Sequence, residues 1–142
     1  MRLLGFLLVC LFFNVFGSNA SVITVGGLKQ FSQIKKAIEF SRAGDTIDIY
    51  EGLYKEGNII IDKQLHLRGI NKPVLDGEKR FEVISIKASY SVVEGLIIQH
   101  SGFGTLDDPG GIKVYDANNV LIYNNKLVDN FFGIYIQFGK NC

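Results

Sequence analysis

An internal repeat of short strand-like segments constrains the fold of this chain more than any other feature. The segment Gly-Ile-Lys-Val at 111–114 returns as Gly-Ile-Tyr-Ile at 133–136, and Asn119 returns as Asn141, both at an offset of 22 residues. Earlier segments match at offsets of 29 and 26 residues, and the longer offset reflects a seven-residue insertion at 103–109. A period near 22 with insertions is typical of solenoid proteins.

Within each repeat, apolar residues alternate with polar ones, as they do in half-buried β-strands. The alternating runs contain the pairs Ile47 and Ile49, Ile59 and Ile61, Leu65 and Leu67, Ile84 and Ile86, Ile112 and Val114, and Ile134 and Ile136. Asn, Asp and Gly separate these runs and permit the left-handed backbone of tight corners.

Strands that stack on their own counterparts one coil later form parallel sheets. Residues 46–142 are therefore predicted to form an all-β solenoid, a right-handed parallel β-helix, in which Lys113, Tyr135 and Gln137 face outward. An antiparallel sandwich is the alternative fold, but it does not explain a fixed offset. The sequence stops at Cys142, where the register expects another strand, which predicts that the β-helix is truncated at its C-terminus.

Residues 1–20 have the pattern of a secretory signal peptide. Arg2 precedes an apolar run from Leu3 to Phe13, and small residues precede the expected cleavage after Ala20. The apolar run is short for a transmembrane helix, although an uncleaved anchor remains the alternative. The mature chain is therefore predicted to be exported to the periplasm, with no stable membrane span.

Residues 21–45 are predicted to form an N-terminal capping segment that contains an α-helix. Phe31, Ile34, Ala37 and Ile38 fall on one face at helical spacing. We expect Ser32 to cap the start of this helix, Gly44 to end it, and the helix to cover the open first coil.

Several segments resemble a known family. Segments 34–38, 43–47 and 51–56 resemble the N-terminal region that exported right-handed β-helices share. Four further segments are more specific: Glu56-Gly57-Asn58-Ile59-Ile60-Ile61, Pro73-Val74-Leu75-Asp76-Gly77, Gly95-Leu96-Ile97-Ile98-Gln99 and Asn130-Phe131-Phe132-Gly133-Ile134-Tyr135-Ile136-Gln137. In this order they resemble the N-terminal part of the NosD-type periplasmic maturation proteins of nitrous-oxide reductase. The resemblance implies a β-helix that works with an ABC transporter to assemble the copper–sulfur centre of the reductase, and it implies copper binding.

Copper prefers imidazole or sulfur ligands. His66 and His100 are the candidate metal ligands, because Cys142 is the only other residue of the mature chain that offers such a ligand. His66 lies between two inward leucines and therefore points outward. The register places His100 at a different corner of another coil. We therefore expect the two imidazoles not to converge, and the residues themselves predict no metal site.

A possible loop or partner site comprises Asp107 and Asp108 in the insertion together with Tyr115, Tyr123 and Tyr135. Paired carboxylates bind Ca²⁺ or act as acid and base on a sugar, whereas an Asp before Pro is also an ordinary turn. The tyrosines are expected to face outward, where they form a docking surface or simply reflect strand preference.

The net charge of the chain and the positions of its two His residues argue against several classes of function. The chain has 15 basic and 14 acidic residues, and cleavage removes Arg2, which leaves 14 of each and argues against nucleic acid as a ligand. The two His residues do not assemble a nucleophilic constellation, so we predict no catalytic or cofactor-binding residues and a protein that is not an enzyme. The alternative is a carbohydrate-binding or polysaccharide-degrading β-helix with Asp107 and Asp108 near its groove.

Overall fold

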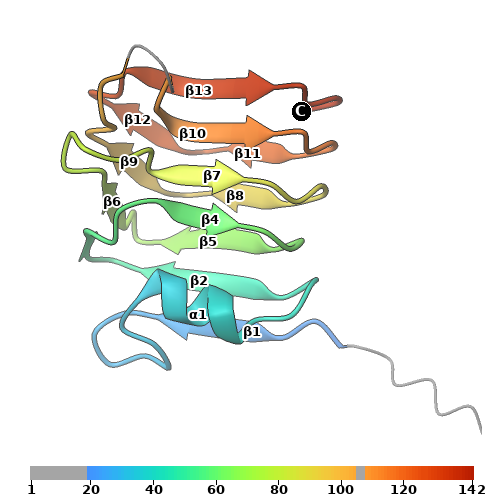
Figure 1. The fold of residues 1–142 in the computed structure, drawn as a ribbon. Helices are drawn as coiled ribbons and strands as arrows, with labels where there is room; N and C mark the ends of the chain where they lie inside the picture. Colours follow the sequence, from blue (N-terminus) through green and yellow to red (C-terminus); the bar gives the residue numbers. More distant parts are fainter. Residues whose placement is uncertain (1–18, 105–107) are drawn as a thin grey trace, which may run out of the picture.

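The computed structural model describes residues 19–104 and 108–142, and over these ranges the chain is a right-handed parallel β-helix (Figure 1). Its coils stack along one axis and contribute strands to three parallel sheets. The first sheet contains, in order, β1 (Val22–Val25), β2 (Thr46–Tyr50), β5 (His66–Ile70), β8 (Val92–Glu94) and β11 (Leu121–Tyr123). The second contains β3 (Leu53–Tyr54), β6 (Val74–Asp76), β9 (Ile97–Gln99) and β12 (Lys126–Val128). The third contains β4 (Ile59–Ile61), β7 (Ile84–Ile86), β10 (Gly110–Tyr115) and β13 (Phe132–Gln137).

The strand register confirms the predicted repeat. Ile112 pairs with Ile134 at the offset of 22, and Asn141 donates to the side chain of Asn119 at 3.5 Å with the same offset. The insertion is also confirmed, because Gln99 pairs with Val128 while Gly110 pairs with Phe132. Non-glycine residues with positive φ lie at corners as expected, among them Asn71, Asn119, Asn124 and Asn141.

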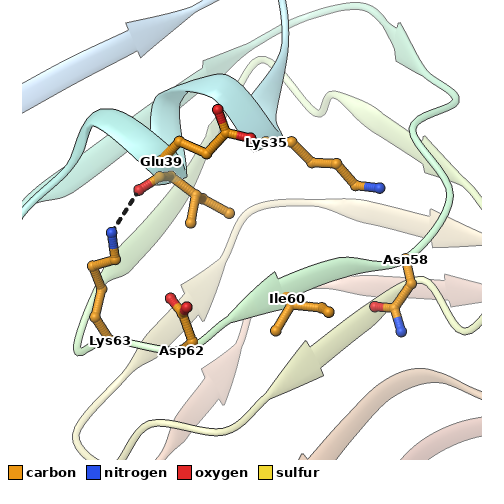
Figure 2. Close-up of a pocket in the computed structure, with 7 residues that line it drawn as sticks. Lys35, Glu39, Asn58, Ile60, Asp62 and Lys63 are labelled. Atoms are coloured by element: carbon orange, nitrogen blue, oxygen red, sulfur yellow. Dashed lines mark hydrogen bonds between the residues drawn. The ribbon is translucent and has the colours of Figure 1, made fainter.

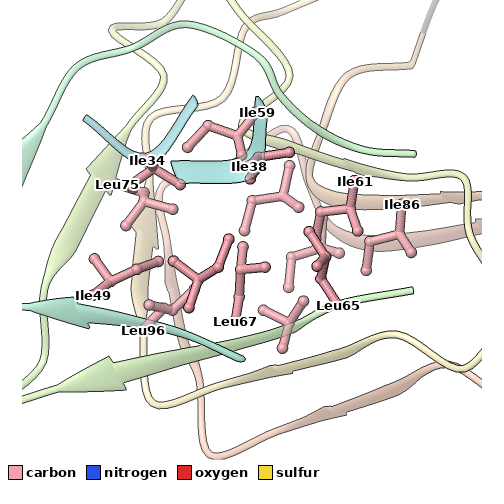
Figure 3. Close-up of a cluster of buried hydrophobic side chains, with 14 of the residues drawn as sticks. Ile34, Ile38, Ile49, Ile59, Ile61, Leu65, Leu67, Leu75, Ile86 and Leu96 are labelled. Atoms are coloured by element: carbon pink, nitrogen blue, oxygen red, sulfur yellow. The ribbon is translucent and has the colours of Figure 1, made fainter. Parts of the chain in front are cut away.

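The core lies between the three sheets and consists of the inward residues of the alternating runs (Figure 3). Ile59 of β4, Ile84 of β7 and Ile112 of β10 form one continuous ladder, and each is at most 1% exposed. Aliphatic side chains that stack on identical neighbours lose apolar surface to water on both sides. This burial is the main favourable contribution to folding.

The capping segment contains a strand as well as the expected helix. β1 pairs in parallel with β2, so the stack begins at Val22, 24 residues before the predicted start at Thr46. Asp45 fixes the start of this coil: its Oδ2 accepts from the backbone N–H of Arg42 and its Oδ1 from that of Ser21, both at 2.8 Å. These two hydrogen bonds lower the pKa of Asp45.

Helix α1 (Ile34–Phe40) takes the place of the third strand in the first coil and lies beside β4 (Figure 1). It buries Ile34, Ala37 and Ile38, as its spacing predicted. The predicted ends were wrong. Gln33, not Ser32, is the N-cap residue and makes no side-chain capping bond, and the helix ends at Phe40 instead of reaching Gly44. No helix among the described residues is long and apolar enough to cross a membrane.

The N-terminus of α1 is capped from the next coil, which explains why a local capping residue is dispensable. Glu56 Oε1 accepts from the N–H of Ile34 at 2.7 Å, and Glu56 Oε2 accepts from that of Lys35 at 2.9 Å. One carboxylate therefore satisfies two of the unpaired donors of the first turn and places negative charge at the positive end of the helix.

Replacing Glu56 with alanine is expected to lower the free energy of unfolding by about 1–2 kcal/mol, because both N–H groups lose their acceptor. Urea denaturation monitored by circular dichroism measures this loss. Glu51→Ala is the matched control, since Glu51 is exposed in the same coil and is expected to change stability by less than about 0.5 kcal/mol. Equal stability of the two variants would contradict the capping role.

Candidate functional site

The acidic pair of the insertion is only partly described. Asp107 lies outside the described residues. Asp108 is half-buried with a φ of 43° and stands directly before Pro109 and β10. The structure places Asp108 at the turn that leads into the third sheet.

His66 points outward from β5, as predicted, and the two imidazoles contact different carboxylates. His66 Nε2 lies 2.7 Å from Glu94 Oε1 on the first sheet. His100, directly after β9 of the second sheet, has its Nδ1 3.1 Å from both oxygens of Asp76 and its Nε2 3.7 Å from Asp129 Oδ2. Across residues 19–104 and 108–142, no three His, Cys, Asp or Glu side chains are grouped so as to hold a metal ion.

The outer face of the first sheet carries a polar ladder that ends at Tyr123. Asp48, Arg68, Glu94 and Tyr123 follow one another in register on β2, β5, β8 and β11. Arg68 donates to both carboxylate oxygens of Asp48, at 2.8 and 2.9 Å. The hydrogen bond from Tyr123 is the main cause of the lowered pKa of Glu94, and the same bond raises the pKa of Tyr123. Tyr123 is exposed, as predicted, but it is tied to the ladder.

The other two candidate tyrosines lie on the outer face of the third sheet, on either side of Lys113. The Lys113 ammonium lies 4.8 Å from the ring centroid of Tyr115 and 5.0 Å from that of Tyr135. Lys113 faces outward from β10, as predicted, but it is only 6% exposed. The flanking rings cover its stem and replace water around its charge with aromatic faces.

Glu82 is a buried carboxylate that the sequence did not single out. Both of its oxygens accept from the Tyr115 hydroxyl at 3.1 Å, and Oε1 also contacts the hydroxyl of Ser85. Ser85 Oγ in turn lies 2.9 Å from Asn58 Oδ1. Tyr115 follows Val114, which pairs with Ile86, so its side chain must extend back along the sheet to reach Glu82. No repeat pattern encodes that contact.

Two pockets adjoin this network on the outer face of the third sheet. The first, of about 270 Å³, lies between α1 and β4, and Figure 2 shows Lys35 and Glu39 of the helix opposite Asn58 and Ile60. The second, of about 310 Å³, lies between the start of the insertion and the residues before β7. Asn58 lines both pockets. The first is otherwise lined by Lys35, Ile38, Glu39, Ile60, Asp62 and Lys63, and the second by Arg80, Phe81, Glu82, Phe103, Gly104, Pro109 and Tyr115.

Comparison of the chain with protein-family models, with curated proteins and with solved structures finds no match. The resemblance to the NosD-type family therefore rests on the segments of sequence quoted above.

Proposed function

We propose that this chain is an exported β-helical accessory protein that takes part in the maturation of nitrous-oxide reductase, with components of an ABC transporter, and that it acts by binding. The observation that carries the proposal is the order of the resembling segments. They fall on successive coils: 56–61 on the coil of β4, 73–77 on that of β6, 95–99 on that of β9 and 130–137 on that of β13. The resemblance thus follows the whole stack.

Many residues in those segments hold the framework together. Glu56 caps α1, Asp76 contacts His100, and Asn130 accepts from the N–H of Ser101 at 3.0 Å while donating to the carbonyl of Ile98 at 3.0 Å. Partner recognition is therefore assigned to outward side chains. A rigid stack of coils keeps such side chains at fixed spacings, which suits docking to a folded partner. We assign the reductase-facing contacts to the exposed Tyr123 and the half-buried Tyr135.

The copper implied by the resemblance does not fit the described residues. Copper sites use clustered imidazole, thiolate or thioether ligands. His66 and His100 lie on different sheets and contact different carboxylates, and the exposed Cys142 Sγ lies near the carbonyl oxygens of Ala117 and Lys140. The proposal therefore assigns no metal-transfer step to these residues. Tight copper binding by the exported chain, measured at neutral pH with Cu(I) competition, would contradict this assignment.

Deletion of the gene is expected to leave a nitrous-oxide reductase that lacks its catalytic copper–sulfur centre. Visible absorption and copper content of the purified reductase, together with nitrous-oxide consumption by the cells, measure this loss. Complementation with Tyr123→Ala is expected to restore less of the centre than the wild-type gene, whereas Asp107→Asn is expected to be nearly silent. A reductase with a full copper–sulfur centre in the deletion strain would overturn the proposal.

The carbohydrate alternative makes the opposite prediction for the acidic pair. If Asp107 and Asp108 act on a sugar, Asp107→Asn abolishes polysaccharide binding or degradation and leaves the reductase unaffected. Tyr123→Ala and Asp107→Asn, compared in one strain, therefore distinguish the maturation function from the carbohydrate function.

A further inference from the structure

A third pocket lies at the corner where the strands of the first sheet lead into those of the second. It has a volume of about 600 Å³ and spans three successive coils, at 69–72, 95–97 and 124–126; we call it the corner pocket. Its lining combines lysine, asparagine and glycine with two aliphatic residues, and none of the described residues that line it carries a carboxylate.

The corner pocket exists because the middle corner, between β8 and β9, presents almost no side chain to the outside. Gly95 has none, and Leu96 is only 1% exposed because it packs into the core. The upper corner is fastened to this floor by Asn125, whose Oδ1 accepts from the N–H of Leu96 at 3.0 Å and whose Nδ2 donates to the carbonyl of Val93 at 2.9 Å. The cavity is therefore preformed, which lowers the entropy cost of binding.

Two lysines line the corner pocket from opposite sides of this floor. Lys126 is in register with Ile97, which is in register with Val74, and Lys72 lies two residues before Val74. The two lysines are therefore two coils apart, which is roughly 10 Å along the axis. Both are exposed, and within residues 19–104 and 108–142 neither ammonium has an ion-pair or hydrogen-bond partner.

The positive charge of the corner pocket is a local feature, because the whole chain has a formal net charge of only +1. Glu94, at the end of β8, is held on the outer face of the first sheet, where it lies 2.7 Å from His66 Nε2. Glu51 precedes β3 in the coil below and does not line the pocket. Two cations at one concave site that lacks acidic side chains produce a positive potential that attracts anions.

The lining favours an anion that carries two negative charges on one group. Lysine binds phosphate as a point charge on a flexible stem, so two lysines at one cavity can approach the same phosphoryl group. A phosphomonoester carries roughly −1.5 to −2 charges at pH 7, which matches two ammonium groups. Asn71 and Asn124 add amide donors to the same cavity, and its volume leaves room for a group attached to the phosphorus.

We propose that the corner pocket binds a phosphoryl dianion, either free phosphate or a small phosphomonoester, between the ammonium groups of Lys72 and Lys126. The site goes beyond the maturation role and does not depend on it. Neither Tyr123 nor Tyr135 lines the pocket. Loss of phosphate binding would therefore leave the expected effect of gene deletion on the copper–sulfur centre unchanged.

The test is titration of the isotopically labelled exported protein with inorganic phosphate and with glycerol 3-phosphate, followed by amide chemical shifts at neutral pH and low salt. At least one of the two is expected to shift the amides at 69–72, 95–97 and 124–126 and to leave those of the third sheet unchanged. The comparison between them distinguishes free phosphate from a phosphomonoester. Failure of both to shift these amides, or shifts confined to another face, would overturn the proposal.

Two further anions test why a phosphoryl dianion is preferred. Succinate carries its two charges on separate groups, and glycerophosphoethanolamine, the headgroup of a phospholipid, is a diester with one negative charge on its phosphate. Both are expected to bind more weakly than the better of the two phosphoryl ligands. Binding of succinate or of the diester with equal or higher affinity would contradict the assignment.

Lys72→Gln and Lys126→Gln are each expected to weaken binding about fivefold, because each removes one of the two positive charges. The double variant is expected to lose measurable binding. Lys140→Gln is the matched control, since Lys140 is exposed, does not line the pocket and makes the same change in net charge; its affinity is expected to change less than about twofold. Circular dichroism verifies that each variant is folded. Equal weakening in all three single variants would mean that the anion is attracted by net charge and not by this pocket.

Discussion

Replacing Gly69 with alanine is expected to destabilise the protein by about 3 kcal/mol, because the added methyl group has no room between two coils. A Cβ atom on Gly69 would overlap the backbone carbonyl oxygen of Gly95 in the next coil and would lie 2.9 Å from Leu96 Cδ2. The carbonyl belongs to the backbone next to β8, which is paired with β5. The coils must therefore separate locally to admit the methyl group.

Gly27→Ala is the matched control for this substitution. A Cβ atom on Gly27 meets nothing within 4 Å, and Gly27 is not among the positive-φ glycines. The control is expected to stay within about 0.5 kcal/mol of the wild type, or to gain slightly from the lower entropy of its unfolded chain. Urea denaturation of both variants, followed by circular dichroism, gives the two values. A Gly69→Ala protein as stable as Gly27→Ala would show that the coils are farther apart than the structure places them.

The close approach of the Gly69 and Gly95 backbones also explains why the repeat could be detected in the sequence. Gly69 and Gly95 recur at the 26-residue offset because their backbones approach too closely to leave space for side chains. Ile112 and Ile134 recur at 22 because they stack in one ladder. Features imposed by stacking repeat from coil to coil. The strands, their register and the insertion could therefore be predicted.

Features that occur once in the stack could not be predicted in the same way. The cap of α1 is a carboxylate 22 residues away in sequence, so a search for a local Ser or Asp selected Ser32 wrongly. β1 was missed because its strand of four residues stands alone before a helix and has no earlier coil to match. Such contacts follow from the three-dimensional stack and leave no periodic signal.

The candidate site residues show the same distinction between features that repeat from coil to coil and contacts that occur once. Alternation correctly predicted that His66, Tyr123 and Tyr135 project from the outer faces, since the direction of a strand side chain depends only on its position. It did not predict that Lys113 is covered or that Glu82 is buried beneath Tyr115. Those outcomes depend on which way a long side chain lies across neighbouring strands, and strand register does not specify that direction.

Ile84→Ala is expected to lower the free energy of unfolding by about 3–4 kcal/mol, through lost burial and the cavity left behind. Ile84 is fully buried between Ile59 and Ile112 in the inward ladder of the third sheet. With isoleucines in register on both sides and strands hydrogen-bonded on both edges, the site has little freedom to collapse. The cavity cost is therefore expected to remain.

Ile134→Ala removes the same atoms from the same ladder and serves as the comparison. Ile134 is 43% exposed on β13, the last strand of the third sheet, so its truncation is expected to cost only about 1 kcal/mol. Urea denaturation of both variants measures the difference. Because the two substitutions are chemically identical, their difference isolates burial. A loss at Ile134 as large as that at Ile84 would mean that the outer edge of β13 is covered in solution, by further chain or by a partner.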